Sequence, residues 1–448
     1  MTFHCDTALI GGSPVRSVRI HADPAGRIAR IEVDTPPQDG DVRLELVMPG
    51  AGNAHSHAFH RVLRGRTHDD GGDFWRWRER MYAAAARLEP DTYFVLAHGV
   101  FGEMLAAGYT AVAEFHYVHH RPDGTPYVPV HAMERALADA AADTGIRLTL
   151  LDTCYLTGGI ATPLEGVQRR FGDATAAAWL ERWHALRDAL DPAVVVGAAL
   201  HSVRAVPPDE IAAVVAGLPS DVPLHVHLSE QSQENADCLA AYGVTPTRLL
   251  ADAGALSPRL SVVHATHLTE DDIGMLGGAE VTVVMCPTTE ADLGDGIGPA
   301  RRLADTGARI ALGSDQNAVV DPFLEARALE AGERLASGRR GRFTPGELTT
   351  ALTEHGYRAL GRTGGIRVGA DCDLVEIDAT SARTVGADPS QVVLAATATD
   401  VQRVIVGGQV RARAGTLCRP SGGHVGPADL LAAALAPFDD PREEPDGR

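Results

Sequence analysis

NAHSHAFHRVLRGRTH, residues 53–68, is the segment from which the fold can be worked out. It follows an apolar run, and His55 and His57 lie two residues apart within it. Side chains at positions i and i+2 of a strand project to the same face, so a strand that ends here directs two imidazoles towards one point. That spacing is typical of metal ligands. Two histidines do not complete a site, so further ligands have to come from other strands.

Short runs rich in β-branched residues alternate with alanine- and leucine-rich stretches along most of the chain, which indicates parallel βα units. The runs cover residues 46–57, 109–117, 147–155, 193–202, 222–230, 260–268, 281–290 and 309–317. Eight such units predict an α/β protein with a (β/α)8 or TIM barrel, whose active site lies at the carboxyl ends of the strands. In most runs the hydrophobic residues come first and the His, Glu, Asp or Asn comes last, as such a site requires.

The two ends of the chain differ from this pattern. Residues 1–48 contain short strand-like segments, and so does the region that begins near residue 366. Neither end is large enough to bury a core alone. We therefore expect a barrel over residues 49–360 and a small composite β-sandwich domain from residues 1–48 and 361–435, the second part including a terminal helix. Residues 436–448 are charged and contain proline, which predicts a disordered tail.

Composition excludes several classes of protein. The net charge is −19, so the chain lacks the excess of cations that binding to nucleic acid or to an anionic membrane needs. No apolar run approaches the roughly 18 residues that span a bilayer. The six cysteines are scattered without a Cys-x-x-Cys pair, and the first residues lack the features of a signal peptide. We therefore expect a cytoplasmic protein.

Further metal ligands can come from the fifth, sixth and eighth runs. HVHLSE contains His227 and Glu230, VVHATH contains His264, and LGSDQN contains Asp315. Imidazole nitrogens and a carboxylate oxygen suit one divalent first-row ion such as Zn²⁺ or Fe²⁺. If one position stays open for water, Zn²⁺ lowers the pKa of that water from about 15.7 towards 7. Glu230, close to the ion, is suited to carry protons.

This combination of residues resembles the amidohydrolase superfamily over essentially the whole chain. Many members bridge two metal ions with a carboxylated lysine, and this chain contains no lysine. The resemblance therefore implies the single-metal site of the deaminases, and a homodimer. It also implies roles for individual residues: His55, His57, His227 and Asp315 as metal ligands, Asp315 as acceptor of the water proton, Glu230 as proton donor to the substrate nitrogen, and His264 as stabiliser of the attacked centre.

Several segments narrow the resemblance to the superfamily members that act on N-formimidoyl-L-glutamate, an amidine with two carboxylates. These segments are NAHSHAFHRVLRG, FWRWRERMY, EFHYVHH, HSVRAV and CPTTEADLGDGIGP. The implied reaction is hydrolysis to N-formyl-L-glutamate and ammonia, a step of histidine degradation. The resemblance implies substrate contacts from Arg78, Tyr117, His201 and Arg204. Planar guanidinium groups bind carboxylates in a bidentate manner, which fits this dicarboxylate substrate.

His60 departs from the resemblance, because many members have glutamine at this position. A histidine still donates a hydrogen bond to the substrate, but it is bulkier, so we expect the same reaction class with an altered substrate fit. Two other functions stay open. One is an aromatic aminohydrolase acting on a guanine-, cytosine- or triazine-type ring, which predicts an aromatic cavity in place of Arg78 and Arg204. The other is a barrel without catalysis that serves as a scaffold.

Overall fold

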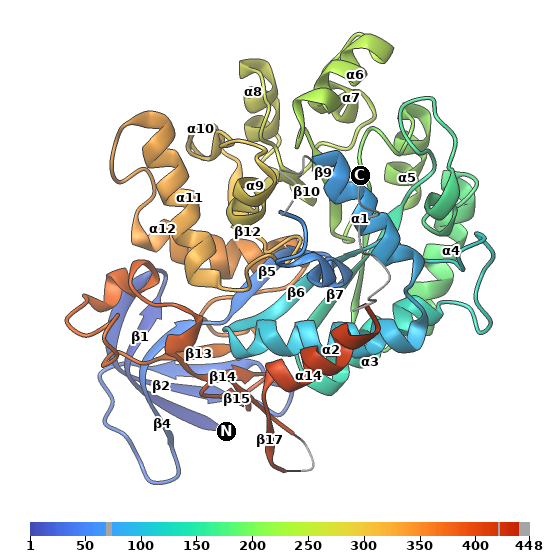
Figure 1. The fold of residues 1–448 in the computed structure, drawn as a ribbon. Coiled ribbons are helices and arrows are strands. Elements are labelled where there is room, and N and C mark those ends of the chain that lie inside the picture. The colour runs from blue at the N-terminus through green and yellow to red at the C-terminus, as the bar shows by residue number, and fades with distance from the viewer. Residues whose placement is uncertain (69–73, 420–421, 439–448) are drawn as a thin grey trace.

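A computed structural model describes residues 1–68, 74–419 and 422–438 of the protein. Two sheets organise it: an eight-stranded parallel sheet that curls into a barrel, and a separate nine-stranded sheet. Figure 1 shows the nine-stranded sheet at the lower left, with the barrel and its helices above and to the right. The prediction of a TIM barrel with an additional β domain is confirmed.

The barrel strands follow the predicted runs in chain order, and each pairs in parallel with the next. Their bounds are β5 (Ala51–Ser56), β6 (Tyr109–His116), β7 (Arg147–Cys154), β8 (Val195–Leu200), β9 (Leu224–Leu228), β10 (Leu260–His264), β11 (Thr282–Met285) and β12 (Arg309–Leu312). Most of their residues are buried. Burial on both faces is expected of parallel strands that are covered by helices.

The barrel closes between β5 and the segment that follows β12. The Asp315 amide donates to the His55 carbonyl at 3.0 Å, and the His57 amide donates to the Asp315 carbonyl at 2.9 Å. These are the ladder bonds of a parallel pair. Backbone pairing at the closure therefore brings three predicted ligands together before any side chain is considered.

The connecting helices lie between successive strands, as the βα alternation predicts. They are α1 (Phe74–Ala86), α2 (Pro90–Ala106), α3 (Ala132–Thr144), α4 (Ala176–Ala189), α5 (Pro208–Gly217), α6 (Ser232–Tyr242), α7 (Pro246–Asp252), α8 (Glu270–Gly278), α9 (Pro287–Leu293), α10 (Ala300–Asp305), α11 (Pro322–Ser337), α12 (Pro345–Thr350) and α13 (Gly356–Ala359). Short η helices add to them at η1 (Ala58–Leu63), η2 (Gly166–Arg170), η3 (Ala351–His355), η4 (Pro389–Leu394) and η5 (Ala398–Asp400). Proline occupies the first turn of α2, α7 and α11, where its missing N–H costs nothing.

Both ends of the chain contribute to the nine-stranded sheet. The first part supplies β1 (Thr2–Ile10), β2 (Ser13–Ala22), β3 (Ile28–Glu32) and β4 (Val42–Pro49). The second part supplies β13 (Leu374–Ile377), β14 (Val401–Val406), β15 (Gln409–Arg413), β16 (Thr416–Cys418) and β17 (His424–Val425). The two parts join where β4 and β13 pair antiparallel. Phe3, Val18, Ile20 and Leu374 belong to the apolar cluster that this sheet buries.

The first predicted run, residues 46–57, is divided between the two sheets. Leu46 to Pro49 belong to β4 of the nine-stranded sheet, and the barrel begins only at β5. Gly50 connects β4 to β5. A Cβ atom at Gly50 would lie 2.1 Å from Oγ1 of Thr110, so only glycine fits this close approach.

The terminal helix α14 (Pro427–Leu435) packs against α2 of the barrel, and the two lie side by side in Figure 1. Its Leu431 and Ala434 belong to the main hydrophobic core. Ala436 to Phe438, at the start of the predicted disordered tail, form the short helix η6 instead. The rest of that prediction, residues 439–448, lies outside the described residues.

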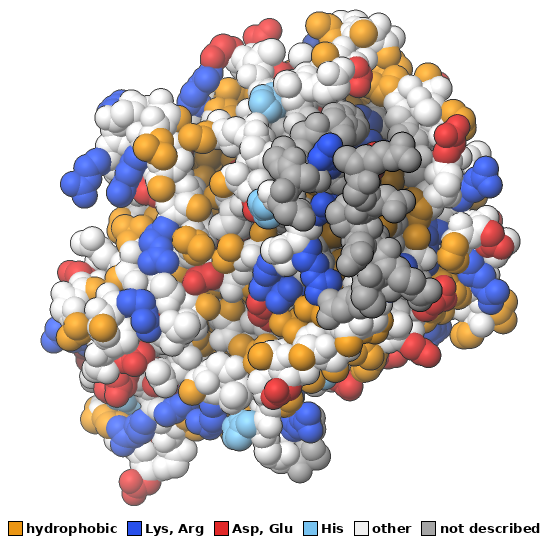
Figure 2. All heavy atoms as spheres, viewed as in Figure 1, with side chains coloured by type: hydrophobic (Ala, Val, Ile, Leu, Met, Phe, Trp, Pro, Cys, Tyr) orange, Lys and Arg blue, Asp and Glu red, His pale blue; other side chains and the backbone are white. Residues whose placement is uncertain are grey.

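The surface carries interspersed charges of both signs. Figure 2 shows arginine, acidic and apolar side chains mixed over the barrel helices and the nine-stranded sheet on one face. Among the described residues, no helix is both long enough and apolar enough to cross a membrane.

Candidate active site

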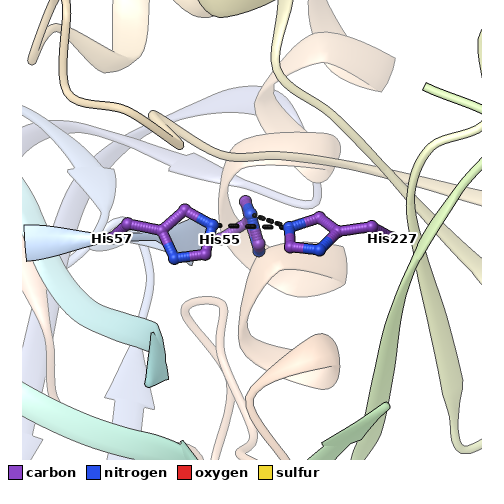
Figure 3. Close-up of side chains that lie close together, drawn as sticks. All are labelled: His55, His57 and His227. Carbon is purple, nitrogen blue, oxygen red and sulfur yellow. Dashed lines mark hydrogen bonds between the residues drawn. The ribbon is translucent and has the colours of Figure 1, made fainter. Parts of the chain in front are cut away.

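Three imidazoles and one carboxylate converge at the carboxyl ends of β5, β9 and β12. Nε2 of His227 lies 3.1 Å from Nε2 of His55 and 3.4 Å from Nε2 of His57. Oδ1 of Asp315 lies 3.3 Å from Nε2 of His55 and 3.5 Å from Nε2 of His57. Figure 3 shows the rings of His57 and His227 approaching from opposite sides, with His55 between them.

These separations fit a metal ion. Zinc with bonds of about 2.0–2.1 Å to nitrogen holds tetrahedral ligand atoms about 3.3–3.4 Å apart. The ring protons of His57 and His227 lie on Nδ1, on the side of each ring that faces away from the shared point. Nδ1 of His57 donates to the Phe115 carbonyl, and Nδ1 of His227 donates to the His201 carbonyl, both at 2.9 Å. Each Nε2 therefore presents a lone pair to the shared point, which is the arrangement that a metal ion between them would stabilise.

Burial keeps these rings neutral. It lowers the pKa of His57 to about 3, and it lowers the pKa of His55 and His227 well below the ordinary value. A neutral imidazole is the form that binds a metal.

A buried amide and hydroxyl network fixes this end of the barrel. Ser314 donates its amide to Oδ1 of Asn53 at 2.9 Å, and Nδ2 of Asn53 contacts Oγ of Ser314 at 2.6 Å. Asn317 accepts from Ser314 and donates to the His57 carbonyl. Asp315, between them, has a φ of 45°, and His264 has a φ of 71°. Non-glycine residues in this left-handed region are strained, and such strain concentrates at functional sites.

Glu230 and His264 lie beside the ligand cluster. Nε2 of His264 is 3.7 Å from Oε1 of Glu230 and 3.8 Å from Oδ2 of Asp315, and its Nδ1 is 3.4 Å from Oε1 of Glu290. Burial opposes protonation of His264, but the charges of Glu230, Asp315 and Glu290 raise its pKa to about 10. Three carboxylates thus lie within 4 Å of the His264 ring, beside the ligand cluster.

The cluster forms one end of a cavity of about 150 Å³. Every predicted site residue lines this cavity except His55, which is fully buried beneath it. The lining includes His57, His60, Arg78, Tyr117, His201, Arg204, His227, Glu230, His264 and Asp315. The structure therefore brings together residues that are spread over more than 250 positions of the chain.

Both predicted arginines are held by neighbours. Nε of Arg204 lies 2.8 Å from Oε2 of Glu234, and its Nη2 lies 3.9 Å from Oε2 of Glu230. Nε of Arg78 donates to the hydroxyl of Tyr82 at 2.7 Å, and its guanidinium lies over the Tyr82 ring. Fixed guanidinium groups bind a carboxylate with less loss of conformational entropy than mobile ones.

His60 bonds to Tyr117, with 3.0 Å between Nε2 and the phenolic oxygen. Its ring packs on His57 at 4.4 Å between centroids, and its Nδ1 has no hydrogen-bond partner among the described residues. His201 packs against Tyr155 at 4.5 Å. These rings form an aromatic wall beside the ligand cluster.

Four residues of the site were missed by the sequence reasoning. Glu234 pairs with Arg204, Glu290 approaches His264, and Tyr82 and Tyr155 line the cavity. Tyr155 ends the third predicted run, so the strand-end rule could have found it. Glu234 lies in the first turn of α6, four residues after Glu230, but nothing local distinguishes it from a surface glutamate.

A second group of imidazoles and carboxylates lies outside this cavity. Nδ1 of His119 is 2.8 Å from Oε1 of Glu134, and Nε2 of His116 is 3.4 Å from the same oxygen. Nη1 of Arg182 contacts Asp152 at 2.8 Å and Glu134 at 3.5 Å. The guanidinium already supplies the cation of this group, so the first cluster is the stronger metal site.

Comparison with known proteins agrees with this geometry. The Amidohydrolase family model matches residues 46–411, which include all the predicted ligands. The chain belongs to the amidohydrolase family. Its barrel and neighbouring sheet superpose on an amidohydrolase from Brucella melitensis with a TM-score of 0.89 and 31% sequence identity, over 98% of this chain and 99% of that one.

Two relatives indicate the kind of reaction. This amidohydrolase is 38% identical to a formimidoylglutamate deiminase from Pseudomonas aeruginosa over 83% of this chain and 85% of the relative. It is 30% identical to a 5-methylthioadenosine/S-adenosylhomocysteine deaminase from Halobacterium salinarum over 87% of this chain and 86% of that relative. The protein is thus a metal-dependent hydrolase of C–N bonds, of the deaminase type.

Proposed function

We propose that the protein hydrolyses N-formimidoyl-L-glutamate to N-formyl-L-glutamate and ammonia, with Zn²⁺ as the ion at the ligand cluster and Fe²⁺ as the alternative. The observation that carries this proposal is the pair of guanidinium groups, Arg78 and Arg204, that lines the same cavity as the ligand cluster. A substrate with two carboxylates and an amidine needs two fixed cations at a distance from its reacting carbon.

The reaction balances with one water. A bond forms between the water oxygen and the amidine carbon, and the bond from that carbon to the terminal nitrogen breaks. Both water protons leave with that nitrogen as ammonia. A divalent ion at this site would supply a water of lowered pKa. The residues of the chain have to move two protons and to stabilise the tetrahedral centre.

The positions of three side chains suit these tasks. Asp315 accepts the first proton, because its Oδ1 faces the shared point of the ligand cluster while its Oδ2 faces His264. Glu230 carries a proton to the departing nitrogen, since it lines the cavity 3.7 Å from His264. His264 donates to the oxygen that develops charge, which is the usual role of a protonated imidazole at such a position.

Arg204 binds one carboxylate and Arg78 the other. Nε of Arg204 is engaged by Glu234, which leaves its Nη groups to bind the carboxylate. Tyr117, His201 and His60 complete the binding site with hydrogen bonds. Because His60 is bulkier than the glutamine of many relatives, we expect tighter discrimination of substrate length on this side.

A second candidate is an aromatic aminohydrolase that acts on a purine. Trp77, Tyr82, Tyr117, Tyr155 and Phe171 line the cavity, and the relative from Halobacterium salinarum is named for a purine nucleoside. The two guanidinium groups favour the dicarboxylate over this candidate, because each can form bidentate, charge-assisted hydrogen bonds that a carboxylate accepts and a neutral ring does not.

A substrate panel tests the proposal. The metal-loaded protein would be assayed for ammonia release from formimidoyl-glutamate, formimidoyl-aspartate, formimidoyl-glycine and 5-methylthioadenosine. We expect the highest kcat/KM with the glutamate compound and a loss of about tenfold or more with glycine, which lacks the second carboxylate. Equal rates with glutamate and glycine, or release from the purine alone, would contradict the proposal.

A further inference from the structure

Asp295 lies two residues beyond α9, next to Glu230, and has no role in the function described above. It is 3% exposed, and among the described residues it does not line the cavity, whereas Glu230 does. Its Oδ1 accepts a hydrogen bond from Nε2 of Gln231, and its amide donates to the Glu290 carbonyl at 2.9 Å. These bonds fix both its backbone and one carboxylate oxygen.

The other oxygen of Asp295 has no partner. Oδ2 is buried and forms no hydrogen bond with any described residue. One oxygen of Asp295, one oxygen of Glu230 and one ring nitrogen of His264 lie within 4.8 Å of one another. A buried carboxylate oxygen without a partner is costly, so the Asp295 carboxylate has to carry a proton or lie beside a cation.

The surrounding charges favour a proton. Glu230, Glu290 and Asp315 face the same region, and all are at most 8% exposed. The nearby cations are His264 and Arg204, and Arg204 is already paired with Glu234. Burial, together with the charge of Glu230, raises the pKa of Asp295 to about 8. A carboxyl among so many like charges holds a proton at neutral pH.

We propose that Asp295 is a neutral carboxylic acid that positions Glu230 for proton transfer, by donating its carboxyl proton to the Glu230 carboxylate. The inference rests on the role of Glu230 proposed above. A donor of this kind holds the carboxylate in one orientation and favours its ionised form, which is the form that accepts a proton. A small rotation of the side chain or one bridging water spans the separation of up to 4.8 Å.

The first test requires no substrate. Infrared difference spectra of the metal-loaded wild type and Asp295→Asn would be compared from neutral to alkaline pH. We expect a band of a protonated carboxyl in the wild type at neutral pH that is absent from the variant and disappears at alkaline pH. A spectrum without this band would overturn the inference, whatever the protein does to formimidoylglutamate.

The second test separates positioning from folding. We expect Asp295→Ala to lower kcat by about 10- to 100-fold with KM nearly unchanged, the usual effect of removing an outer partner of a site. Asp295→Asn keeps a donor towards Glu230, so it should recover most of that loss. Asp305→Asn, at the exposed last residue of α10, is the matched control. The melting temperature of each variant reports its folding.

Two outcomes of the second test contradict the inference. One is an Asp295→Ala variant that is folded and has wild-type kcat. The other is a metal analysis in which Asp295→Asn binds one ion per chain fewer than the wild type, because Asp295 would then be a ligand of a second cation and not a proton donor.

Discussion

His227 is the ligand that comes from the strand opposite the two histidines of β5 and its end. Its Nε2 contacts both His55 and His57. We expect His227→Ala to lose the metal ion and nearly all activity, because two imidazoles and one carboxylate bind a first-row ion far more weakly than the full set. Metal content by elemental analysis and ammonia release measure the effect.

His225 is the matched control for this variant. It lies on the same strand, but its Nε2 donates to the Ala359 carbonyl at 2.8 Å, away from the cluster. His225→Asn should therefore keep a full complement of metal, with some loss of stability. If both variants kept their metal, the assignment of His227 as a ligand would be wrong.

A variant of Arg204 tests substrate binding. Because a hydrogen bond to a charged group contributes about 1.5–3 kcal/mol, Arg204→Met should lower kcat/KM for formimidoylglutamate by roughly 10- to 150-fold. Steady-state kinetics measure this, with Arg248→Met as the control, since Arg248 pairs with Asp252 at the surface, away from the cavity. An unchanged kcat/KM for Arg204→Met would favour the aromatic aminohydrolase.

At the scale of the elements, the closure of the barrel between β5 and the segment after β12 holds three predicted ligands in place, His55, His57 and Asp315. Asn53 on β5 and Ser314 after β12 bond to each other while fully buried. Removing one partner leaves the other unsatisfied, so we expect Asn53→Ala to lower the free energy of unfolding by about 1–3 kcal/mol and to weaken metal binding. Urea unfolding and a metal-chelator competition measure the two effects. A variant with normal stability and normal metal affinity would show that this network does not support the site.

The elements also show what the sequence can predict. His57, His227 and Asp315 could be found because each follows a hydrophobic strand, and parallel strands bring their carboxyl ends together. Glu234 and Asp295 could not, since their importance depends on the side chains opposite them. The same holds for His119, whose partner Glu134 comes from α3. The change from one sheet to the other at Gly50 was also missed, because a single apolar run supplies strands to both sheets.

At the scale of the whole molecule, buried carboxyl groups set the dependence of stability on pH. Glu325 on α11 is fully buried, and burial raises its pKa to about 8 although Thr288 donates to it. In the unfolded chain it titrates near 4.3. The folded state therefore binds the extra proton between these values, and stability falls as pH rises through them.

Glu325→Gln tests this directly, because glutamine keeps the shape and one acceptor but does not titrate. We expect the melting temperature of the variant to fall less than that of the wild type between pH values of about 5 and 8. Calorimetry at several pH values measures both slopes. Parallel curves would mean that Glu325 is ionised in the folded protein.

The whole chain combines a barrel that supplies the reacting groups with a sheet built from its two ends. The arrangement leads to one central claim, that a dicarboxylate amidine and not a nucleoside is the substrate. A single competition measures this: N-formimidoyl-L-glutamate and 5-methylthioadenosine at equal concentration in one reaction with the zinc-loaded protein, followed by NMR. We predict that N-formyl-L-glutamate forms while the nucleoside is unchanged. Conversion of the nucleoside with formimidoylglutamate left intact would contradict the account.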